Sequence, residues 1–359
     1  MPTDLRAREL AKLAVKKCVK LKKNEVIIIS GSSEAEPFIV ELYKQAILSG
    51  AHPIIKMSPN NISDFFYKYA NKEQLTHFPQ HLMDLVKSAQ CYIGINTDMN
   101  TRELTSADPN KIKIREKVTA PISNYIVNTR DKIRRVTIAY PCIAHAIEAE
   151  MSLVEWENFV YNACLQDWDR LKKRLNKIKK VFKEGSNVHL IGKNVDLKFK
   201  VHGGKAISDL ETFENMPGGE IFMAPFRESL NGWIKFEYPA IESCKEVNGI
   251  YLEFENGKVI NARAEKNQDF LFSMLNTDEN SRYIGEFGIG CNLKITKFTK
   301  NLLFDEKING TIHLALGMAY KENGGGNDSA IHWDLVKDMK EAKIIVDGKI
   351  IQEKGKWRI

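Results

Sequence analysis

Asn24-Glu-Val-Ile-Ile-Ile-Ser-Gly31 is a short apolar run that ends in small residues, as a buried β-strand does. An amphipathic stretch follows over residues 34–48 and stops before Gly50, where a helix would end. Ala51-His-Pro-Ile-Ile-Lys-Met57 then has the composition of a second strand. The order of strand, helix and strand predicts a βαβ unit with parallel strands.

The same alternation continues through the first half of the chain. Helical patterns lie at residues 62–69, 81–88 and 109–123, and strand-like runs lie at 91–95 and 135–140. This pattern predicts an α/β N-terminal domain with a largely parallel sheet that helices cover on both faces. A helical pattern over 153–184 ends at Gly185-Ser186. We place the domain boundary there, which gives an N-terminal domain of residues 1–185 and a C-terminal domain of 186–359.

The second half has a different character, because strand signals with glycine-containing turns dominate it. The segments 253–260 and 343–351 each carry an Asn-Gly or Asp-Gly pair between apolar runs, which is the signature of a β-hairpin. One helix is expected over 267–275. The sequence therefore predicts an α+β, strand-rich C-terminal domain with antiparallel pairing.

Bulk properties agree with two globular domains. The chain has 359 residues, more than one ordinary core holds, and no apolar run is long enough to cross a membrane. We expect no secretory signal at the N-terminus, since Lys and Arg recur through residues 6–23. The six cysteines (Cys18, Cys91, Cys142, Cys164, Cys244 and Cys291) show no paired spacing, so we expect reduced thiols, a cytoplasmic protein and no membrane contact.

The net charge of +7 raises the possibility of a binding protein without enzymatic activity. Such an α/β protein would hold nucleic acid or an anionic ligand, using the basic run 170–183 and the small residues 30–33 after the first strand. Four apolar residues recur at helical spacing within the basic run, which favours a solvated helix face. The segment 30–33 also lacks the G-x-G-x-x-G pattern of dinucleotide sites. We therefore expect no nucleic-acid partner.

Two glutamates stand in glycine-rich segments that are hard to explain as solvated surface. Glu220 follows two glycines in Met216-Pro-Gly-Gly-Glu-Ile-Phe-Met-Ala-Pro225, and Glu286 lies in Gly285-Glu-Phe-Gly-Ile-Gly290. Glycine permits a close approach of backbones, and a buried carboxylate needs a cation or a full set of hydrogen bonds. Both glutamates are therefore candidate metal ligands, although full hydrogen bonding would explain each of them equally well.

Three further residues complete a possible ligand set. His313 alternates along a strand with apolar residues and shares its face with the small Thr311 and Ala315. In Ile331-His-Trp-Asp334, the side chains of His332 and Asp334 would point to one face of an extended segment. Each alone has a common structural explanation, a packed histidine or a capping aspartate. Together, two Glu, two His and one Asp suit two divalent cations.

The order of these segments resembles the aminopeptidase T-type family of metallopeptidases, which includes aminopeptidases S and II. The resemblance rests on 216–225, on 285–290, on His313-Leu-Ala-Leu-Gly-Met-Ala-Tyr320 and on Ser329-Ala-Ile-His-Trp-Asp334, and it extends more weakly through the N-terminal half. It implies a two-metal exopeptidase that removes N-terminal residues from peptides. The ligands that it implies are Glu220, Glu286, His313, His332 and Asp334.

The resemblance also implies two further site residues. Tyr320, seven places after His313, corresponds to the family's active-site tyrosine, which lines the metals or stabilises the reaction intermediate. The family has another acidic residue shortly before the first histidine. Glu306 lies in that neighbourhood, although its spacing to His313 is about two residues longer than in the family. We count Glu306 as the sixth candidate ligand.

The expected chemistry follows from the ligand types. Carboxylates and imidazoles suit zinc, cobalt or manganese. Glu286 is the candidate to bridge the two cations, and Tyr320 the candidate hydrogen-bond donor to the developing oxyanion. A carboxylate would serve as general base, and the sequence leaves open which one. The resemblance further implies a homodimer that acts on peptides with a free N-terminus.

Overall fold

The computed structural model describes residues 4–242 and 244–359, and its contacts divide the chain into two compact units. The first unit runs to Leu165 and also contains Phe213–Pro217. The second unit consists of Gln166–Thr212 and Gly218–Ile359. The boundary after residue 185 stays a prediction from the sequence.

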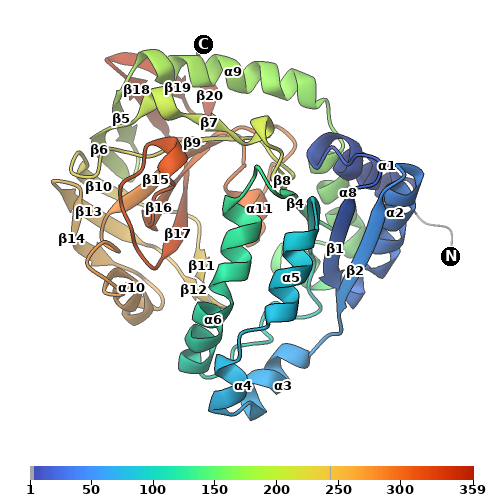
Figure 1. Cartoon of the computed structure of the whole chain (residues 1–359). Coiled ribbons are helices and arrows are strands. Elements are labelled where there is room, and N and C mark those ends of the chain that lie inside the picture. The colour runs from blue at the N-terminus through green and yellow to red at the C-terminus, as the bar shows by residue number, and fades with distance from the viewer. Residues whose placement is uncertain (1–3, 243) are drawn as a thin grey trace. The chain divides into compact units, whose positions relative to one another are not determined.

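A parallel five-stranded sheet forms the centre of the first unit, in the order β2-β1-β3-β4-β8. Its strands are β1 (Val26–Ser32), β2 (His52–Ser58), β3 (Cys91–Asn96), β4 (Arg134–Ala139) and β8 (Asn215–Met216). Figure 1 shows this sheet between layers of helices. The parallel α/β fold expected from the run at 24–57 is therefore confirmed.

Helices cover both faces of this sheet because its strands are apolar on both faces. On one face, Ile28 packs with Val86 of α5 and with Ile122 and Tyr125 of α6. On the opposite face, Ile27 and Ile29 are fully buried. Figure 1 shows α1 and α2 beside β1 and β2. The helices are α1 (Leu5–Leu13), continued by the π-helical turn η1 (Ala14–Cys18), η2 (Ser33–Ala35), α2 (Glu36–Leu48), α3 (Ile62–Tyr69), α4 (Lys72–Thr76), α5 (Gln80–Ser88), α6 (Pro109–Asn128), α7 (Ile143–Glu148) and α8 (Leu153–Cys164).

The single helix expected over 153–184 is wrong, because the structure has two helices there. After α8 the backbone leaves the helical region at Leu165, and α9 (Trp168–Glu184) begins three residues later. Asp167 caps the new helix by accepting a hydrogen bond of 2.9 Å from the backbone N–H of Arg170. Such a cap favours a helix start over continuation of the preceding helix, and periodicity alone does not reveal it.

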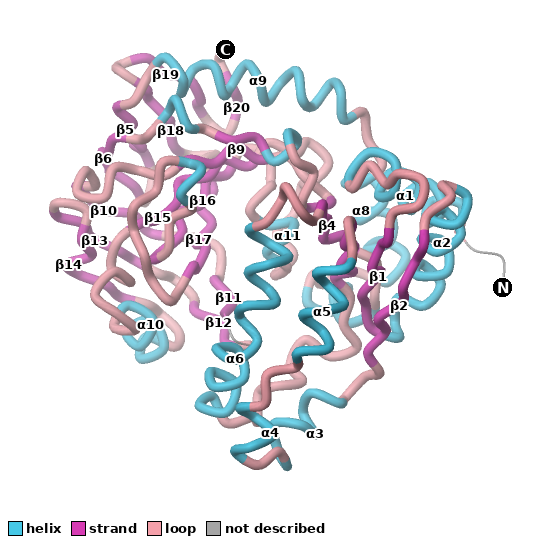
Figure 2. Tube along the Cα trace, in the orientation of Figure 1, coloured by secondary structure: helices cyan, strands magenta, loops and turns pink. Residues whose placement is uncertain are grey.

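Antiparallel sheets dominate the second unit, as expected (Figure 2). The larger sheet has the order β14-β13-β10-β6-β5-β18-β19-β20. Its strands are β5 (Asn187–Gly192), β6 (Val195–Lys200), β10 (Asn231–Lys235), β13 (Tyr251–Glu255), β14 (Lys258–Arg263), β18 (Ala342–Val346), β19 (Lys349–Glu353) and β20 (Lys356–Trp357). Both expected hairpins are present. All four turn residues, Asn256-Gly257 and Asp347-Gly348, have positive φ, as tight hairpin turns require.

A second, five-stranded sheet has the order β17-β16-β15-β9-β7. Its strands are β7 (Ile207–Ser208), β9 (Glu220–Met223), β15 (Ile284–Gly290), β16 (Thr311–Gly317) and β17 (His332–Asp338), and β11 (Ala240–Glu242) pairs separately with β12 (Lys245–Val247). The remaining helices are η3 (Gly203–Lys205), η4 (Asp209–Glu211), α10 (Gln268–Leu275), α11 (Leu302–Asp305) and η5 (Lys321–Asn323). Within the described ranges, no helix is long and apolar enough to cross a bilayer.

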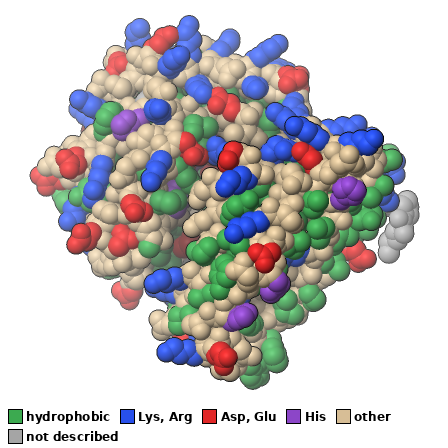
Figure 3. Space-filling view, viewed as in Figure 1, with side chains coloured by type: hydrophobic (Ala, Val, Ile, Leu, Met, Phe, Trp, Pro, Cys, Tyr) green, Lys and Arg blue, Asp and Glu red, His purple; other side chains and the backbone are tan. Residues whose placement is uncertain are grey.

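Helix α9 covers part of the second unit with an apolar stripe. Leu171, Leu175, Ile178 and Phe182 are buried, and the ring of Phe182 meets Phe287 of β15 edge-on at 6.0 Å. The lysines and arginines between them are mostly exposed, and Figure 3 shows them as blue side chains along α9. The basic run is therefore a solvated helix face.

Candidate metal centre

The five-stranded sheet brings the candidate ligands to one face by placing each of them opposite a small residue. Across the strands, Glu220 pairs with Gly290 and His313 pairs with Gly288. Glu286 and Asp334 both pair with Ala315, and His332 pairs with Gly317. Paired residues share a face, so the glycines and the alanine leave room there for the larger polar side chains. This register explains why glycines surround the two glutamates in the sequence.

The ligand atoms of these residues lie at metal-binding separations. His313 Nε2 lies 3.6 Å from Glu220 Oε2 and 3.5 Å from Glu286 Oε1. These separations are long for hydrogen bonds but match the edge of a tetrahedral zinc site, about 3.4 Å. Two groups of ligand atoms each lie within 4.8 Å of one another: those of Glu220, Glu306 and His313, and those of Glu286, His313 and Asp334.

Glu306 belongs to the first group although its spacing in the sequence is unusual. It caps the C-terminus of α11, and the preceding Asp305 anchors this turn. Asp305 Oδ1 accepts hydrogen bonds of 2.7 and 2.8 Å from the backbone N–H and the hydroxyl of Thr299. The chain then turns through Gly310, whose φ is +89°, before it enters β16. The turn absorbs the longer spacing, so Glu306 still reaches the side chain of His313.

His332 and Tyr320 lie beside the second group. The Nδ1 of His332 makes a 2.9 Å hydrogen bond with the carbonyl of Met318, and its Nε2 lies 3.6 Å from Asp334 Oδ2. A backbone carbonyl that holds Nδ1–H leaves Nε2 as the metal-binding nitrogen. The ring of Tyr320 is 5.1 Å from the ring of His332. All six candidate ligands and Tyr320 therefore come from one region of the second unit.

The site also passes a test of fit that does not depend on its sequence motifs. Glu220 Oε2, both ring nitrogens of His313 and Asp334 Oδ1 are buried and have no hydrogen-bond partner among the described residues. Buried polar atoms are almost always paired, so such a concentration of unpaired acceptors indicates a missing partner. Oxygen and imidazole donors without a thiolate fit zinc, cobalt or manganese.

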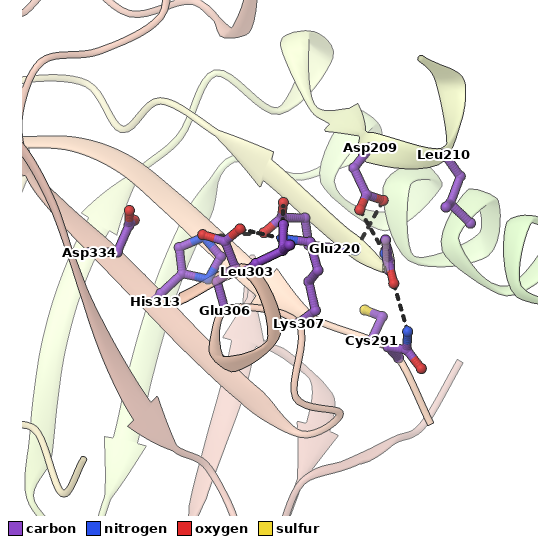
Figure 4. Close-up of polar contacts among 12 residues, drawn as sticks. Asp209, Leu210, Glu220, Cys291, Leu303, Glu306, Lys307, His313 and Asp334 are labelled. Atoms are coloured by element: carbon purple, nitrogen blue, oxygen red, sulfur yellow. Dashed lines mark hydrogen bonds and ion pairs between the residues drawn. The ribbon is translucent and has the colours of Figure 1, made fainter. Parts of the chain in front are cut away.

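Sequence reasoning missed a buried lysine at this site. Lys307 is 0% exposed, and its Nζ contacts Glu220 Oε1 at 3.2 Å and also the carboxylate of Glu306 (Figure 4). Burial alone would lower the pKa of Lys307, but Glu220 and Glu306 outweigh burial and raise it. Lys307 therefore stays a cation beside two candidate ligands. Its position directly after Glu306 was visible in the sequence, but nothing distinguished it from a surface lysine.

Asp209 is a second buried residue that the sequence did not reveal. It accepts hydrogen bonds from the backbone N–H of Gly219 at 2.6 Å and of Glu220 at 3.1 Å, so it fixes the segment that carries Glu220 (Figure 4). Asn323 has a similar relation to Glu286, since its Nδ2 lies 3.4 Å from Glu286 Oε2. These contacts orient the candidate ligands from outside the cluster.

The electrostatics of the cluster favour bound cations. Burial and the nearby Glu306 raise the pKa of Glu220 well above its ordinary value. Burial likewise raises the pKa of Asp334 to about 6. Burial opposes the charge of His313, but contact with Glu286 and the charges of Asp334 and Glu220 raise its pKa to about 9. All three shifts reflect an excess of negative charge in a buried space, which divalent cations would neutralise.

We expect Gly288→Ala to disrupt the site. A Cβ at position 288 would lie 1.9 Å from His313 Nε2, so the imidazole has to leave its place. Metal affinity measured by calorimetry should fall by about a hundredfold, the upper end of the effect of losing a residue that orients a ligand. Gly326→Ala is the control, because a Cβ there meets nothing within 4 Å. Equal metal affinity in the two variants would contradict this geometry.

Comparisons with known proteins point to metallopeptidases. The family model described as thermophilic metalloprotease (M29) matches residues 3–357. Aminopeptidase 2 of Geobacillus stearothermophilus is 25% identical, over 97% of this chain and 96% of its own length. Aminopeptidase T of Thermus aquaticus is 32% identical over 168 residues, which is 40% of each chain.

Solved structures confirm the fold. AmpT from Thermus thermophilus superimposes with a TM-score of 0.87 at 22% identity, over 99% of both chains. A 2,5-dihydroxypyridine dioxygenase from Pseudomonas putida KT2440 has a TM-score of 0.58 at 13% identity, over 98% of this chain and 96% of its own. A dioxygenase thus shares features of this fold, so the reaction has to be argued from the site.

Proposed function

The chain belongs to the thermophilic metalloprotease (M29) family, and we propose that it is an aminopeptidase that uses two divalent cations to hydrolyse N-terminal residues from peptides. The observation that carries this proposal is the set of buried, unpartnered ligand atoms on one face of the five-stranded sheet. The relatives named aminopeptidase 2 and aminopeptidase T support the substrate class. The proposed ligands are Glu220, Glu286, Glu306, His313, His332 and Asp334.

Two groups of ligand atoms support two cations of zinc, cobalt or manganese. His313 belongs to both groups, but its Nε2 has one lone pair and serves one cation. A residue shared by the two cations would therefore be a carboxylate, and Glu286, whose Oε1 lies 3.5 Å from His313 Nε2, is the candidate for this role. When bound, such cations polarise a carbonyl and lower the pKa of a water molecule.

Side chains of the protein would carry out proton transfer, stabilise the oxyanion and position the ligands. A carboxylate of the cluster accepts the proton of the attacking water and passes it to the leaving amine. Tyr320, next to His332, donates a hydrogen bond to the developing oxyanion. Asp209 and Asn323 hold Glu220 and Glu286 in place during these steps, through the contacts described above.

A cytoplasmic homodimer is the proposed form of the protein. The six cysteines are free thiols, which suits a reducing compartment. The first unit exposes apolar side chains on α2, on the edge strand β2 and on α3, among them Leu48 (79%), Met57 (47%) and Phe65 (65%). Figure 3 shows green side chains over these elements. A surface of this kind suits burial against a second copy, and sedimentation measurements test it.

The alternative of a binding protein for nucleic acid or an anionic ligand is not favoured. The basic run at 170–183 is a solvated helix face, and the comparisons point to peptidases. The site in the second unit is instead lined by carboxylates, which attract cations and repel anionic ligands.

Metal removal tests the proposed function directly. We expect protein dialysed against a chelator to lose hydrolysis of a leucine anilide, and added zinc, cobalt or manganese to restore it. Plasma emission spectrometry should find about two divalent cations per chain after reloading. The result that would sink the proposal is chelated and reloaded protein that binds no divalent cation and hydrolyses no aminoacyl anilide or peptide.

A further inference from the structure

A second cluster of reactive side chains lies in the first unit, where the neighbouring strands β3 and β4 end. Asn96 pairs with Ala139 at the ends of these parallel strands. The carboxyl ends of parallel strands meet at one edge of a sheet, which is where α/β proteins commonly place their sites. The segment after β3 carries Thr97 and Asp98, and the segment after β4 carries Cys142, so the topology brings these residues together.

His145 connects Cys142 to Asp98. Cys142 caps the N-terminus of α7, and His145 stands three residues later in the first turn. His145 Nε2 lies 3.1 Å from Asp98 Oδ2, and the imidazole also hydrogen-bonds to the thiol of Cys142. Trp156 of α8 closes the arrangement, with its ring 6.2 Å from the imidazole. The order carboxylate, imidazole, thiol is the one that activates a cysteine nucleophile.

Two further donors face the sulfur. The backbone N–H of Asp98 donates a hydrogen bond to Cys142, and the hydroxyl of Thr97 lies against the same sulfur. The Thr97 hydroxyl is buried and has no hydrogen-bond partner of its own among the described residues. A negatively charged sulfur would satisfy all three donors at once, whereas a neutral thiol accepts hydrogen bonds weakly.

These contacts favour a charged pair of Cys142 and His145. Burial opposes the thiolate, but the hydrogen bond and charge of His145 and the contacts with Asp98 and Thr97 lower the pKa of Cys142 to about 7. Burial likewise opposes the imidazolium, but Asp98 and Cys142 raise the pKa of His145 to about 9. In contrast, burial raises the pKa of Cys18 and of Cys91 to about 12. The same burial therefore leaves Cys142 reactive and the other two inert.

We propose that Cys142, held by His145, Thr97 and Asp98, is a modification site for hydroperoxides, separate from the metal centre. The Cys142 thiolate attacks one oxygen of hydrogen peroxide, a sulfur–oxygen bond forms, and the oxygen–oxygen bond breaks. The leaving hydroxide takes the proton of the His145 imidazolium and departs as water. The sulfur is oxidised by two electrons to sulfenic acid, the peroxide is reduced, and a small thiol reductant restores Cys142.

The size of the expected effect follows from the thiolate fraction. At pH 6, a thiol with a pKa of about 7 is ionised roughly thirtyfold more than an ordinary cysteine with a pKa of about 8.5. The lower basicity reduces intrinsic nucleophilicity by about fivefold. Cys142 should therefore react with peroxide about sixfold faster than an ordinary cysteine at pH 6, before any contribution from the His145 proton. Only 5% of Cys142 is exposed, so a reagent of the size of water is the suitable probe.

The experiment treats the full chain with hydrogen peroxide at pH 6 together with a short unstructured cysteine peptide as internal competitor. Digestion and mass spectrometry then follow oxidation of each cysteine. We expect Cys142 to react about sixfold faster than the peptide. It should also react ahead of Cys244, although Cys244 is more exposed than Cys142. Oxidation of Cys142 no faster than that of the peptide would overturn the proposal.

Variants distinguish activation of the Cys142 thiol by His145 from mere access of peroxide to Cys142. His145→Gln keeps a side chain of similar size but removes the imidazolium, so the pH midpoint of Cys142 oxidation should rise from about 7 toward the ordinary value near 8.5. An unchanged midpoint would show that His145 plays no positioning role and would count against the proposal. Cys142→Ser should keep its aminopeptidase activity and bound metal, since neither Cys142 nor His145 belongs to the metal centre.

Discussion

Glu286→Gln is expected to lower kcat for peptide hydrolysis by at least about a thousandfold, a loss of roughly 4 kcal/mol of transition-state stabilisation. The amide keeps the size of the side chain, so the buried strand β15 around it is undisturbed. It removes the negative charge opposite His313 and one of the two oxygens needed for a bridge. Steady-state kinetics with a leucine anilide, together with metal content, measure the effect.

The matched control is Glu279→Gln. It makes the same chemical change on an exposed glutamate of the same unit, and activity should stay near that of the unmodified protein. Near-normal turnover of Glu286→Gln at full metal content would rule out its bridging role, whereas the other proposed ligands would remain candidates. A variant that loses both metal and turnover would agree with the proposal.

Lys307→Met is expected to destabilise the metal-free protein by about 3–5 kcal/mol, the cost of removing one partner of a buried ion pair. The substitution leaves Glu220 and Glu306 buried at the site with no ammonium between them. The melting temperature of metal-free protein should fall by roughly 10 °C. Added zinc should reverse most of this loss, because a divalent cation neutralises the same carboxylates.

Lys337→Met provides a control of equal burial. Lys337 is also 0% exposed, and it pairs with Glu237 at 2.6 Å, but neither residue is among the proposed ligands. The melting temperature of Lys337→Met should also fall, but added zinc should not restore it as it does for Lys307→Met. Zinc rescue of both variants, or of neither, would contradict the idea that Lys307 and a metal neutralise the same carboxylates. Calorimetric melting with and without zinc distinguishes these outcomes.

Local patterns were sufficient for most of the fold. The strands expected at 24–31, 51–57, 91–95 and 135–140 are β1 to β4 within a residue or two, and their parallel order follows from the helices between them. The hairpin turns at 256–257 and 347–348 were also found, because a positive φ at both turn residues favours Asn, Asp and Gly. The sequence pattern did not reveal the break between α8 and α9, because the helical period continues on both sides of Asp167.

The candidate site was predictable only where chemistry and sequence order coincided. Glu220, Glu286, His313, His332 and Asp334 stood in recognisable segments, and the sheet register gathers them on one face. Lys307 and Asp209 had no such signal, because whether a charged side chain points into a site depends on a turn and not on its neighbours in the sequence. The cluster of Cys142, His145 and Asp98 was missed for a similar reason, since 47 residues separate Asp98 from His145.

The sequence by itself determined the element types, the parallel and antiparallel halves and the kinds of ligand, because periodicity, turn residues and donor chemistry are local properties. The tertiary structure alone decided which small residue faces each candidate ligand, that Glu306 reaches His313 despite its longer spacing, and that a lysine lies buried among the carboxylates. These features arise from contacts between segments far apart in the chain, and such contacts exist only once the sheet has formed.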